Sequence, residues 1–406
     1  MSETKNENPI LILDKIKELE FETRNDTHPI IPEHSIKINE NTFAFICYHY
    51  VVQWTETKID FIKFYKCTND DFRCIGQYNF NDEIIKEPSD FIQMKVENNE
   101  LIIITKKYLI LEKIIINVNG NYFFQNITYK KFDEIPFKIL SDKKIVFYKN
   151  NNLKICKFSL EQNDIKCLFQ YSYDNLATQL DFKKENNDIN KENIEEDDDD
   201  DEYSINQNGE ISNKLCDVIE IKEKNLIIAS FSKYHYYGYD DIDYTFSKYI
   251  ISIIDIKNFQ INSNIFNDIE AEKLFYFGNN ELYSFGYRKF FKLNLKNLKK
   301  ETVLYEEEID TSSHYYHYNI IPFFKDNRLI SFGYYRCGYY HNRDEHKHAC
   351  IINIKDNNLK EIDITNIYYN EYNVNYFPIK LYNDKILIIF EYQLSLFKLN
   401  NNLEKI

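Results

Sequence analysis

One short pattern recurs seven times along this chain of 406 residues. Each copy begins with a polar pair typical of a turn and continues with a run of apolar residues typical of a strand. The first apolar residues of the seven copies are Phe43, Leu101, Ile145, Leu226, Leu282, Leu329 and Ile386. Successive copies lie 44–58 residues apart, except for one interval of 81 residues. Repeated units have to be placed next to one another, so this pattern restricts the fold more than composition does.

Each unit contains the same succession of short strand candidates. The unit around Ile145 is compact, and its four segments read PFKILSD, KKIVFYK, NLKICKFSL and DIKCLFQYS between residues 136 and 172. Such segments are rich in Ile, Phe and Tyr, and Asn, Asp and Lys separate them. Many are apolar on both faces, as expected of sheets that stack face to face. We therefore predict an all-β fold, a β-propeller of seven four-stranded blades.

Two other all-β architectures also contain many short strands. A pair of β-sandwiches would not need seven units with the same four-strand order, and a solenoid would have a more regular spacing. Radial closure also explains how so many strands avoid long exposed edges. The sequence therefore favours the propeller over both.

The repeats resemble those of the WD40/kelch class of β-propellers over about residues 35–406. The resemblance rests on the seven turn-and-strand units and concerns architecture. The sequence departs from both signatures, because it has no Gly-His…Trp-Asp pattern, Trp54 is its one tryptophan, and no unit has the kelch double glycine. The resemblance implies a propeller fold and assigns no activity to any residue.

The segment before the repeats, residues 1–34, is a candidate for closing the ring. Propellers usually combine strands from distant parts of the chain in one blade, and residues 9–23 can supply an outer strand beside the C-terminal unit. They could equally form a short helix, because Ile12, Ile16 and Leu19 would share one helical face. We predict the strand, with the propeller formed by residues 35–406.

The longest interval between repeats contains an acidic insertion at about residues 174–213. Its run EEDDDDDE, at 195–202, supplies eight negative charges of a formal net charge of −15. The insertion cannot bury much apolar surface, so we predict that it is disordered. It is either a solvated loop or a tether for a basic partner, with an attraction that salt would weaken.

Composition argues against several classes of function. The rest of the chain has no basic excess, so direct binding of nucleic acid is not expected. No apolar run approaches the roughly 20 residues of a membrane span, and the polar N-terminus lacks the apolar region of a secretory signal. The eight cysteines form no C-x-x-C pair. We therefore expect a cytoplasmic protein, with the nucleus as an alternative, and neither membrane association nor a cofactor.

The long segments between strands fall on one side of the predicted ring. In a blade with strands a to d from the axis outward, the b–c turn and the d–a connection share one face. The a–b and c–d turns share the other. The long segments are 47–58, 174–213, 232–248, 310–319, 333–350 and 366–376, and all occupy b–c or d–a positions. This clustering is the strongest functional signal in the sequence.

Tyrosine is abundant in these long segments, and arginine occurs among them. Tyrosine offers a large rigid contact area with a hydroxyl, and arginine can pair bidentately with carboxylates or phosphates. We therefore predict a non-catalytic interaction scaffold that binds a protein or peptide partner through this face. The predicted contact residues are Trp54, Tyr236, Tyr237, Tyr315, Tyr316, Arg336, Tyr339, Tyr340 and Arg343. Alternatively, the tyrosine-rich loops pack on one another and merely cap the ring. The oligomeric state stays open.

A second hypothesis places a small-molecule or metal-dependent site in the funnel of the ring. The weak metal candidates are His341, His346 and His348, which lie near Cys337 and Cys350. Their spacing matches no zinc finger, so solvated or hydrogen-bonded histidines are the simpler interpretation, and we predict no bound metal. Clustered histidines could also sense pH.

Signals for catalysis are sparse. The sequence contains no G-x-S-x-G, Walker loop, H-E-x-x-H or dinucleotide fingerprint. Hydrolytic propellers use acids at the centre of the ring, and Asp217 and Glu220 on a predicted inner strand could point there. Both are more simply interpreted as turn and edge residues. We therefore predict that the protein is not an enzyme.

Overall fold

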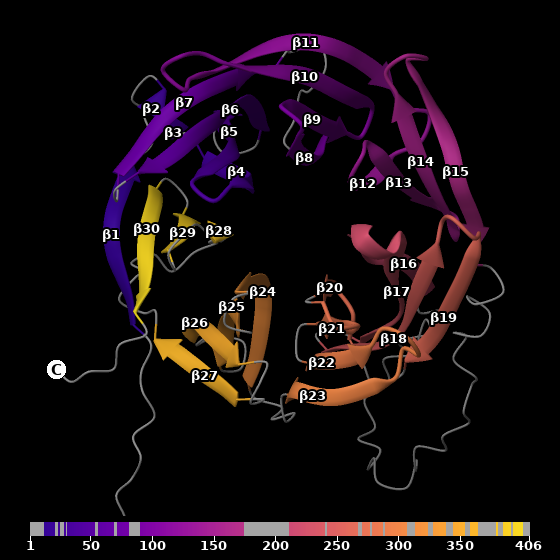
Figure 1. The fold of residues 1–406 in the computed structure, drawn as a ribbon. Helices are drawn as coiled ribbons and strands as arrows, with labels where there is room; N and C mark the ends of the chain where they lie inside the picture. Colours follow the sequence, from indigo (N-terminus) through magenta and orange to yellow (C-terminus); the bar gives the residue numbers. More distant parts are fainter. Residues whose placement is uncertain are drawn as a thin grey trace, which may run out of the picture.

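The structure is a computed structural model in which β-sheets surround a central opening (Figure 1). The backbone is described for residues 12–20, 23–24, 28–29, 31–52, 56–68, 71–80, 90–173, 211–239, 242–266, 270–276, 278–286, 289–306, 313–323, 328–337, 344–353, 358–363, 379–380, 385–390 and 393–400. Side chains are described for residues 36–47, 61–68, 71–80, 90–173, 214–232, 248–266, 270–276, 278–286 and 290–299.

The described strands form seven four-stranded antiparallel sheets, here called blades 1 to 7. Blade 1 contains β4 (Ile31–Asn39), β5 (Thr42–Val52), β6 (Glu56–Thr68) and β7 (Asp71–Asn79). Blade 2 contains β8 (Phe91–Glu97), β9 (Glu100–Thr105), β10 (Tyr108–Ile116) and β11 (Tyr122–Lys131). Blade 3 contains β12 (Pro136–Ile139), β13 (Lys144–Lys149), β14 (Asn152–Ser159) and β15 (Asp164–Ser172).

Blades 4 to 7 have the same antiparallel design. Blade 4 contains β16 (Ile211–Ile221), β17 (Leu226–Tyr239), β18 (Ile242–Asp255) and β19 (Gln260–Phe266), with the 3-10 turn η3 (Lys222–Lys224) after β16. Blade 5 contains β20 (Lys273–Tyr276), β21 (Glu281–Phe285), β22 (Lys289–Asn294) and β23 (Lys300–Glu306). Blade 6 contains β24 (Ser313–Phe323), β25 (Arg328–Cys337), β26 (Asp344–Asn353) and β27 (Asn358–Asp363). Blade 7 contains β28 (Ile379–Lys380), β29 (Lys385–Phe390), β30 (Gln393–Asn400) and β1 (Ile12–Glu20). A separate two-stranded sheet joins β2 (Thr23–Arg24) and β3 (His28–Pro29).

The ring of blades is the architecture of a β-propeller, so the predicted all-β propeller fold is confirmed. In blades 1 to 6 the strands pair in sequence order, with the first strand nearest the central opening (Figure 1). The first apolar residues of the seven repeats all fall in the second strand of a blade, namely β5, β9, β13, β17, β21, β25 and β29. The sequence repeat therefore marks an equivalent strand in each blade.

Blade 7 combines two distant parts of the chain. Strand β1 pairs antiparallel with β30, from Ile12 opposite Asn400 to Glu20 opposite Gln393. It lies outside β30, as Figure 1 shows at the rim of the ring. Within the segment 9–23, residues 12–20 therefore form a strand in the structure.

The hydrophobic core lies between neighbouring blades. On β9, Leu101 and Ile103 pack into a cluster shared with blade 1, whereas Ile102 and Ile104 pack into a cluster shared with blade 3. All four side chains are almost completely buried, and burial of one such side chain stabilises a fold by about 1.5–3 kcal/mol. Because both faces of the strand are buried, its apolar residues do not have to alternate with polar ones.

Asparagine pairs form several of the tight turns. Asn98 and Asn99 join β8 to β9 with φ angles of 53° and 60°, and Asn279 and Asn280 precede β21 with φ angles of 51° and 62°. Two successive positive φ angles define the type I′ turn, whose twist matches that of a β-hairpin. Asparagine tolerates this left-handed conformation better than other residues with a side chain. The chain can therefore build tight hairpins with only eight glycines.

Candidate functional site

Blade topology gives the ring two different faces. The b–c turns and d–a connections belong to one face, which we call the long-hairpin face. The a–b and c–d turns belong to the other, which we call the tight-turn face. Among the described hairpins, β17 and β18 have 14 residues each, whereas β9 and β10 have 6 and 9, and β13 and β14 have 6 and 8. Blades 1 and 6 also have long b–c hairpins, with 11 and 13 residues and with 10 and 10 residues.

Several stretches that we predicted as loops are largely strand. Of residues 333–350, only 338–343 fall outside β25 and β26, and of residues 232–248, only 240–241 fall outside β17 and β18. Residues 313–319, predicted as part of a connection, belong to β24. The physical reason is that tyrosine and threonine favour strands, and a long antiparallel hairpin accommodates polar residues on both faces away from the core.

The predicted contact residues of blade 4 lie at the end of its long hairpin. Tyr236 is opposite Thr245, and Tyr237 is opposite Tyr244, in a ladder that continues to Tyr239. The inner strand β16 extends the ladder, because its first residue is opposite His235. The structure therefore places Tyr236 and Tyr237 on a regular hairpin.

The predicted contact residues of blade 6 lie on three neighbouring strands. Tyr315 and Tyr316 of β24 are opposite Tyr335 and Tyr334 of β25. Arg336 of β25 is opposite His314 on one side and Glu345 on the other. The backbone ladder therefore brings these predicted residues together in one sheet.

Of the three metal candidates of blade 6, the structure describes the backbone of two. His346 of β26 is opposite Tyr335, and His348 is opposite Gly333. The other predicted site residues lie outside the described part of the chain, and they are Trp54, Tyr339, Tyr340, His341 and Arg343. Segment 366–376 and residues 174–210 of the acidic insertion also lie outside it.

A group of charged residues, most of them buried or half-buried, lies beside the central opening in blades 2 to 4, and we call it the inner rim. Its central carboxylate is Asp217 of β16, which is 5% exposed. Lys138 Nζ of β12 lies 2.6 Å from Asp217 Oδ1, and the backbone N–H of Val218 donates to the same oxygen over 2.8 Å. The backbone N–H of Leu274, in β20, donates to Asp217 Oδ2 over 3.0 Å. One carboxylate thus connects blades 3, 4 and 5.

Glu220, also on β16, connects blade 4 to the a–b turn of blade 3. Lys144 Nζ lies 2.7 Å from Glu220 Oε1, and the backbone N–H of Ser141 donates to Glu220 Oε2 over 2.7 Å. The hydroxyl of Ser141 donates to the same oxygen. Burial by itself would raise the pKa of Glu220, but the hydrogen bonds from Lys144 and Ser141 outweigh it and hold that pKa below its usual value.

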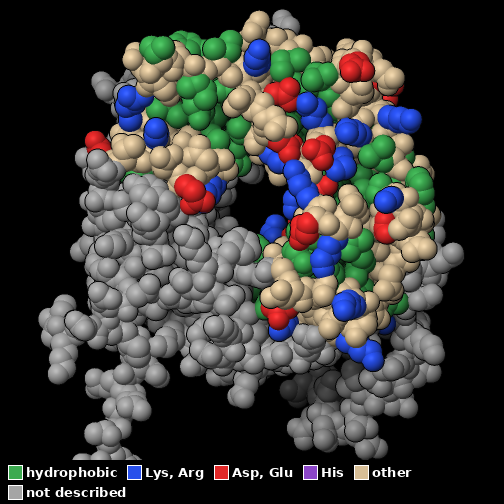
Figure 2. All heavy atoms as spheres, in the orientation of Figure 1, with side chains coloured by type: hydrophobic (Ala, Val, Ile, Leu, Met, Phe, Trp, Pro, Cys, Tyr) green, Lys and Arg blue, Asp and Glu red, His purple; other side chains and the backbone are tan. Residues whose placement is uncertain are grey.

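Glu97, the last residue of β8, connects blade 2 to blades 3 and 4. Lys222 Nζ lies 3.0 Å from Glu97 Oε1, and the backbone N–H of Asp142 donates to Glu97 Oε2 over 3.0 Å. Lys95 Nζ lies 3.5 Å from Glu97 Oε2 and donates to the carbonyl of Leu140 over 2.9 Å. Burial lowers the pKa of Lys95, although Glu97 opposes this shift. Figure 2 shows such blue and red side chains gathered beside the opening.

The inner rim is arranged to hold blades together. Asp217 and Glu220 face positive or N–H donors on the described residues around them, so their oxygens are occupied by the chain itself. A general acid or base needs a pKa near the working pH, and the lowered pKa of Glu220 is far from it. These two acids therefore connect strands, which differs from the simple turn and edge role that we expected.

The partners in the inner rim were not found from the sequence. Lys138 lies 79 residues from Asp217, and Leu274 lies 57 residues from it. No local spacing links such positions. The one available signal is the pair of lysines in the turn SDKK at 141–144, of which Lys144 reaches Glu220.

A second polar group, which we call the outer rim, lies between blades 1 and 2. Glu112 of β10 is 3% exposed, and its Oε1 accepts hydrogen bonds from Tyr78 Oη at 3.2 Å, Asn126 Nδ2 at 3.0 Å and Tyr129 Oη at 3.3 Å. Burial and the nearby carboxylate raise the pKa of Tyr78 well above its usual value. A shallow groove of about 580 Å³ runs beside this group and is lined in part by Tyr122.

The described residues contain neither a metal cluster nor a membrane-spanning helix. No cluster of three or more His, Cys, Asp and Glu side chains there is arranged to hold a metal ion. Within the same residues, no helix has the length and apolar character needed to span a membrane.

Comparison with known proteins finds similar structures, whereas the comparisons with family models and with curated sequences find no match. No protein-family model matches the chain, and no curated protein sequence matches it. The chain is similar to the crystal structure of S. cerevisiae core factor, with 8% identity over 99% of this chain and 63% of that chain and a TM-score of 0.47. It thus spans about 63% of the length of that chain.

Two further solved structures are covered almost completely. Kluyveromyces lactis Hsv2 shares 10% identity over 93% of this chain and 95% of that chain, with a TM-score of 0.48. The WD40 domain of SCAP from fission yeast shares 6% identity over 96% of this chain and 98% of that chain, with a TM-score of 0.41. At these identities the likeness concerns the fold alone.

Proposed function

We propose that this protein is a non-catalytic scaffold that binds a protein or peptide partner through its long-hairpin face. The single observation that supports this proposal is the length of the b–c hairpins of blades 1, 4 and 6. Their ladders continue well beyond the lengths that suffice in blades 2, 3 and 5. Hairpins that only close the ring need no such extension.

The residues on these extensions suit the recognition of a protein surface. The rows Tyr236–Thr245 and Tyr237–Tyr244 in blade 4, and Tyr315–Tyr335 in blade 6, repeat tyrosine on successive positions. Tyrosine is enriched in binding surfaces because it offers a large contact area at low cost in side-chain entropy. A strand ladder also fixes the spacing of its residues before binding, which reduces the ordering cost of association.

Shortening the hairpins tests the proposal, and the register supplies the design. Gly333 is opposite His348, and His235 is opposite Phe246. Residues 334–347 or 236–245 can therefore each be replaced by an Asn-Gly turn that joins opposite positions. Val118→Ser is the control, because Val118 is fully exposed in the c–d turn of blade 2, on the tight-turn face.

The variants would be compared by affinity purification and quantitative mass spectrometry, with circular dichroism as the folding check. We expect partners recovered with the wild type and Val118→Ser to be lost with one or both shortened hairpins. Photo-cross-linking from an aromatic probe placed at Tyr237 or Tyr339 would then show direct contact. Folded hairpin variants that keep every partner, with cross-links only from position 118, would contradict the proposal.

A second candidate function is a metal site on blade 6. It is favoured by one set of residues that lie opposite one another on neighbouring strands. His317 of β24, Gly333 of β25 and His348 of β26 are directly opposite one another, and His346 lies two residues along β26. Opposite residues, and residues two apart on a strand, belong to the same face of a sheet. The three histidines therefore belong to one face, with a glycine between two of them.

Zinc binding to the purified chain separates this candidate from the scaffold. A site made of these histidines should bind about one equivalent of zinc, and His346→Ala combined with His348→Ala should abolish binding. His235→Ala, on the long hairpin of blade 4, is the matched control and should leave binding unchanged. Equal zinc content in all three proteins would rule out a site on blade 6.

A further inference from the structure

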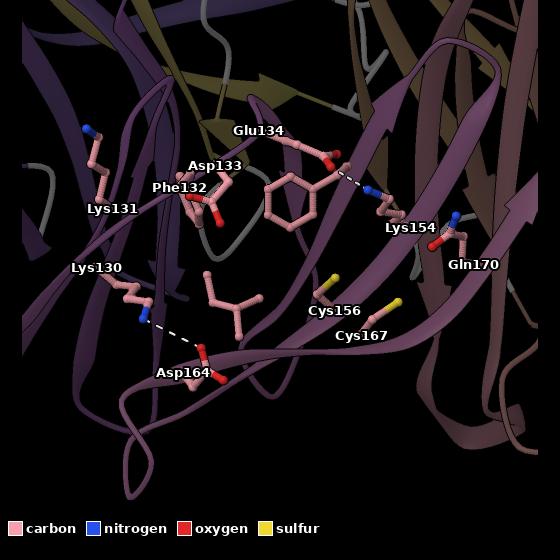
Figure 3. Close-up of a pocket in the computed structure, with 12 residues that line it drawn as sticks. Lys130, Lys131, Phe132, Asp133, Glu134, Lys154, Cys156, Asp164, Cys167 and Gln170 are labelled. Carbon is pink, nitrogen blue, oxygen red and sulfur yellow. Dashed lines mark hydrogen bonds and ion pairs between the residues drawn. The ribbon is translucent and has the colours of Figure 1, made fainter.

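Two cysteines face each other across the outer strands of blade 3. Cys156 of β14 is directly opposite Cys167 of β15, at a point where the register shifts between Ile155 and Cys156. Both are free thiols. Opposite residues in antiparallel strands have Cα atoms about 4.5–5.5 Å apart, which lies inside the range that a disulfide spans. Figure 3 shows the two sulfur atoms beside each other.

This arrangement distinguishes the pair from other cysteines on the described ladders. Cys47 is opposite Phe61, Cys67 is opposite Phe72, and Cys74 is opposite Tyr65. Cys74 is exposed on β7, the outer strand of blade 1, much as Cys167 is exposed on β15. It therefore provides an internal comparison, an exposed thiol with no cysteine opposite it.

Both thiols line a pocket of about 370 Å³ between the end of β11 and blade 3. Cys156 is 7% exposed, whereas Cys167 is exposed and its Sγ lies 3.4 Å from the carbonyl oxygen of Phe169. Ion pairs border the pocket on two sides, Lys154 with Glu134 and Lys130 with Asp164 at 3.6 Å (Figure 3). A small molecule can therefore approach Cys167, and through it Cys156.

We propose that Cys156 and Cys167 are a dithiol–disulfide couple that reacts with small disulfides of the glutathione class. Directly opposite positions of an antiparallel ladder have a Cα separation that a disulfide can span, so the strands can stay paired when the bond closes. The product would join the outermost strand of blade 3 covalently to its neighbour.

The reaction proceeds by two thiol–disulfide exchanges. The Cys167 thiolate attacks one sulfur of the small disulfide, which breaks its S–S bond and releases one thiol. The Cys156 thiolate then attacks Cys167 Sγ in this mixed disulfide and releases the second thiol. Two protein thiols are oxidised, one small disulfide is reduced to two thiols, and the two protons pass to the leaving groups.

The surroundings of Cys156 determine which step is slow. Burial raises the pKa of Cys156 to about 12, and Cys167 adds to this shift. Lys154 on the same strand opposes it, and Glu134, before β12, reinforces it. Only a very small fraction of Cys156 is therefore thiolate at pH 7. The mixed disulfide on Cys167 should therefore accumulate, and its conversion should accelerate about tenfold per pH unit.

Mass spectrometry of the full chain tests the proposal directly. The protein would be incubated with oxidised glutathione at pH 7, 8 and 9, quenched with acid and digested. We expect a peptide cross-linked between Cys156 and Cys167 that forms faster at each higher pH. Cys74 should stop at the glutathione adduct. In Cys156→Ser, the adduct on Cys167 should persist at every pH.

A second measurement on the wild-type protein does not depend on the folding of a variant. Phenylarsine oxide bridges two thiols only where they are close together, so after one equivalent has bound to the folded protein, both Cys156 and Cys167 should stay protected from iodoacetamide added in denaturant, while Cys74 reacts. The proposal is overturned if both thiols remain open to alkylation. It is also overturned if Cys167 keeps its glutathione adduct at pH 9 with no cross-link to Cys156.

Discussion

The inner rim and the outer rim both join neighbouring blades, but they do so with different chemistry. In the inner rim, Asp217 receives Lys138 and two backbone N–H groups, and Glu220 receives Lys144. In the outer rim, every donor described for Glu112 is neutral, since it comes from Tyr78, Asn126 or Tyr129. The carboxylates of the inner rim are thus stabilised largely by charge, whereas the one carboxylate described for the outer rim is stabilised by dipoles.

The contrast shows where ion pairs are useful in a ring of sheets. Strand ends converge around the opening, so one carboxylate there can reach two neighbouring blades, as Asp217 does. At the outer rim the blades diverge, and side chains of two outer strands have to span the gap to Glu112. We therefore expect the stability lost on substitution to depend on charge at the inner rim and on the fit of the side chains at the outer rim.

The largest effect should follow from Asp217→Ala. The change leaves the ammonium of Lys138 and the N–H of Leu274 without their acceptor. Breaking a fully buried pair costs about 3–5 kcal/mol of the free energy of unfolding, and this is the upper limit here because Lys138 is only half-buried. Urea denaturation of the two proteins would measure it. Asp217→Asn, which keeps an oxygen acceptor, is the control and should lose less. A loss below about 1 kcal/mol for Asp217→Ala would show that charge is not what stabilises the inner rim.

Gly76→Ala should have the next largest effect, at the outer rim. A Cβ on Gly76 of β7 would lie 2.7 Å from the Cβ of Tyr122 and 2.9 Å from its carbonyl oxygen. The outer strands of blades 1 and 2 would have to separate, which costs about 1–3 kcal/mol. Gln77→Ala, on the next exposed position of β7, is the control and should change the urea midpoint little. Equal midpoints for both variants would show that the blades separate freely here.

Glu220→Gln should give a pH-dependent loss of stability. The pKa of Glu220 in the folded chain lies below its ordinary value of 4.5, so the carboxylate stabilises the fold above that pH. This contribution disappears as pH falls through the lowered pKa. Wild type and variant should therefore differ by about 1–2 kcal/mol at pH 7 and converge below about pH 4.5. Denaturation at several pH values would check it, and a gap that widens in acid would contradict the assignment.

The smallest effect should come from Glu112→Gln. The amide oxygen can still accept from Tyr78, Asn126 and Tyr129, and the described donors lose no ion pair. We expect a change of less than about 1 kcal/mol in the free energy of unfolding. Glu112→Leu, which removes the acceptor, is the contrasting variant and should cost more. A loss from Glu112→Gln as large as that from Asp217→Ala would show that charge matters equally at both rims.

The blade pattern was predictable because it depends on residues that are neighbours in the sequence. Phe43, Leu101 and Leu282 each follow a polar pair and are fully buried, so a turn and a two-sided apolar run identify the second strand of a blade. The tyrosine-rich ends of the hairpins were mistaken for loops, because polarity was given more weight than the strand preference of tyrosine. The inner rim was missed because Lys138 and Asp217 are 79 residues apart.

The pairing of β1 with β30 also determines when blade 7 can form during synthesis of the chain. Glu20 leaves the ribosome long before its partner Gln393, and at about 5–20 residues per second the wait is roughly 20–75 s. During that time the other blades can pair within themselves, while β1 has an unsatisfied edge. A growing polypeptide with such an edge is exposed to mispairing with another nascent chain. Because of how this ring is closed, blade 7 can be completed only when the end of the chain has been made.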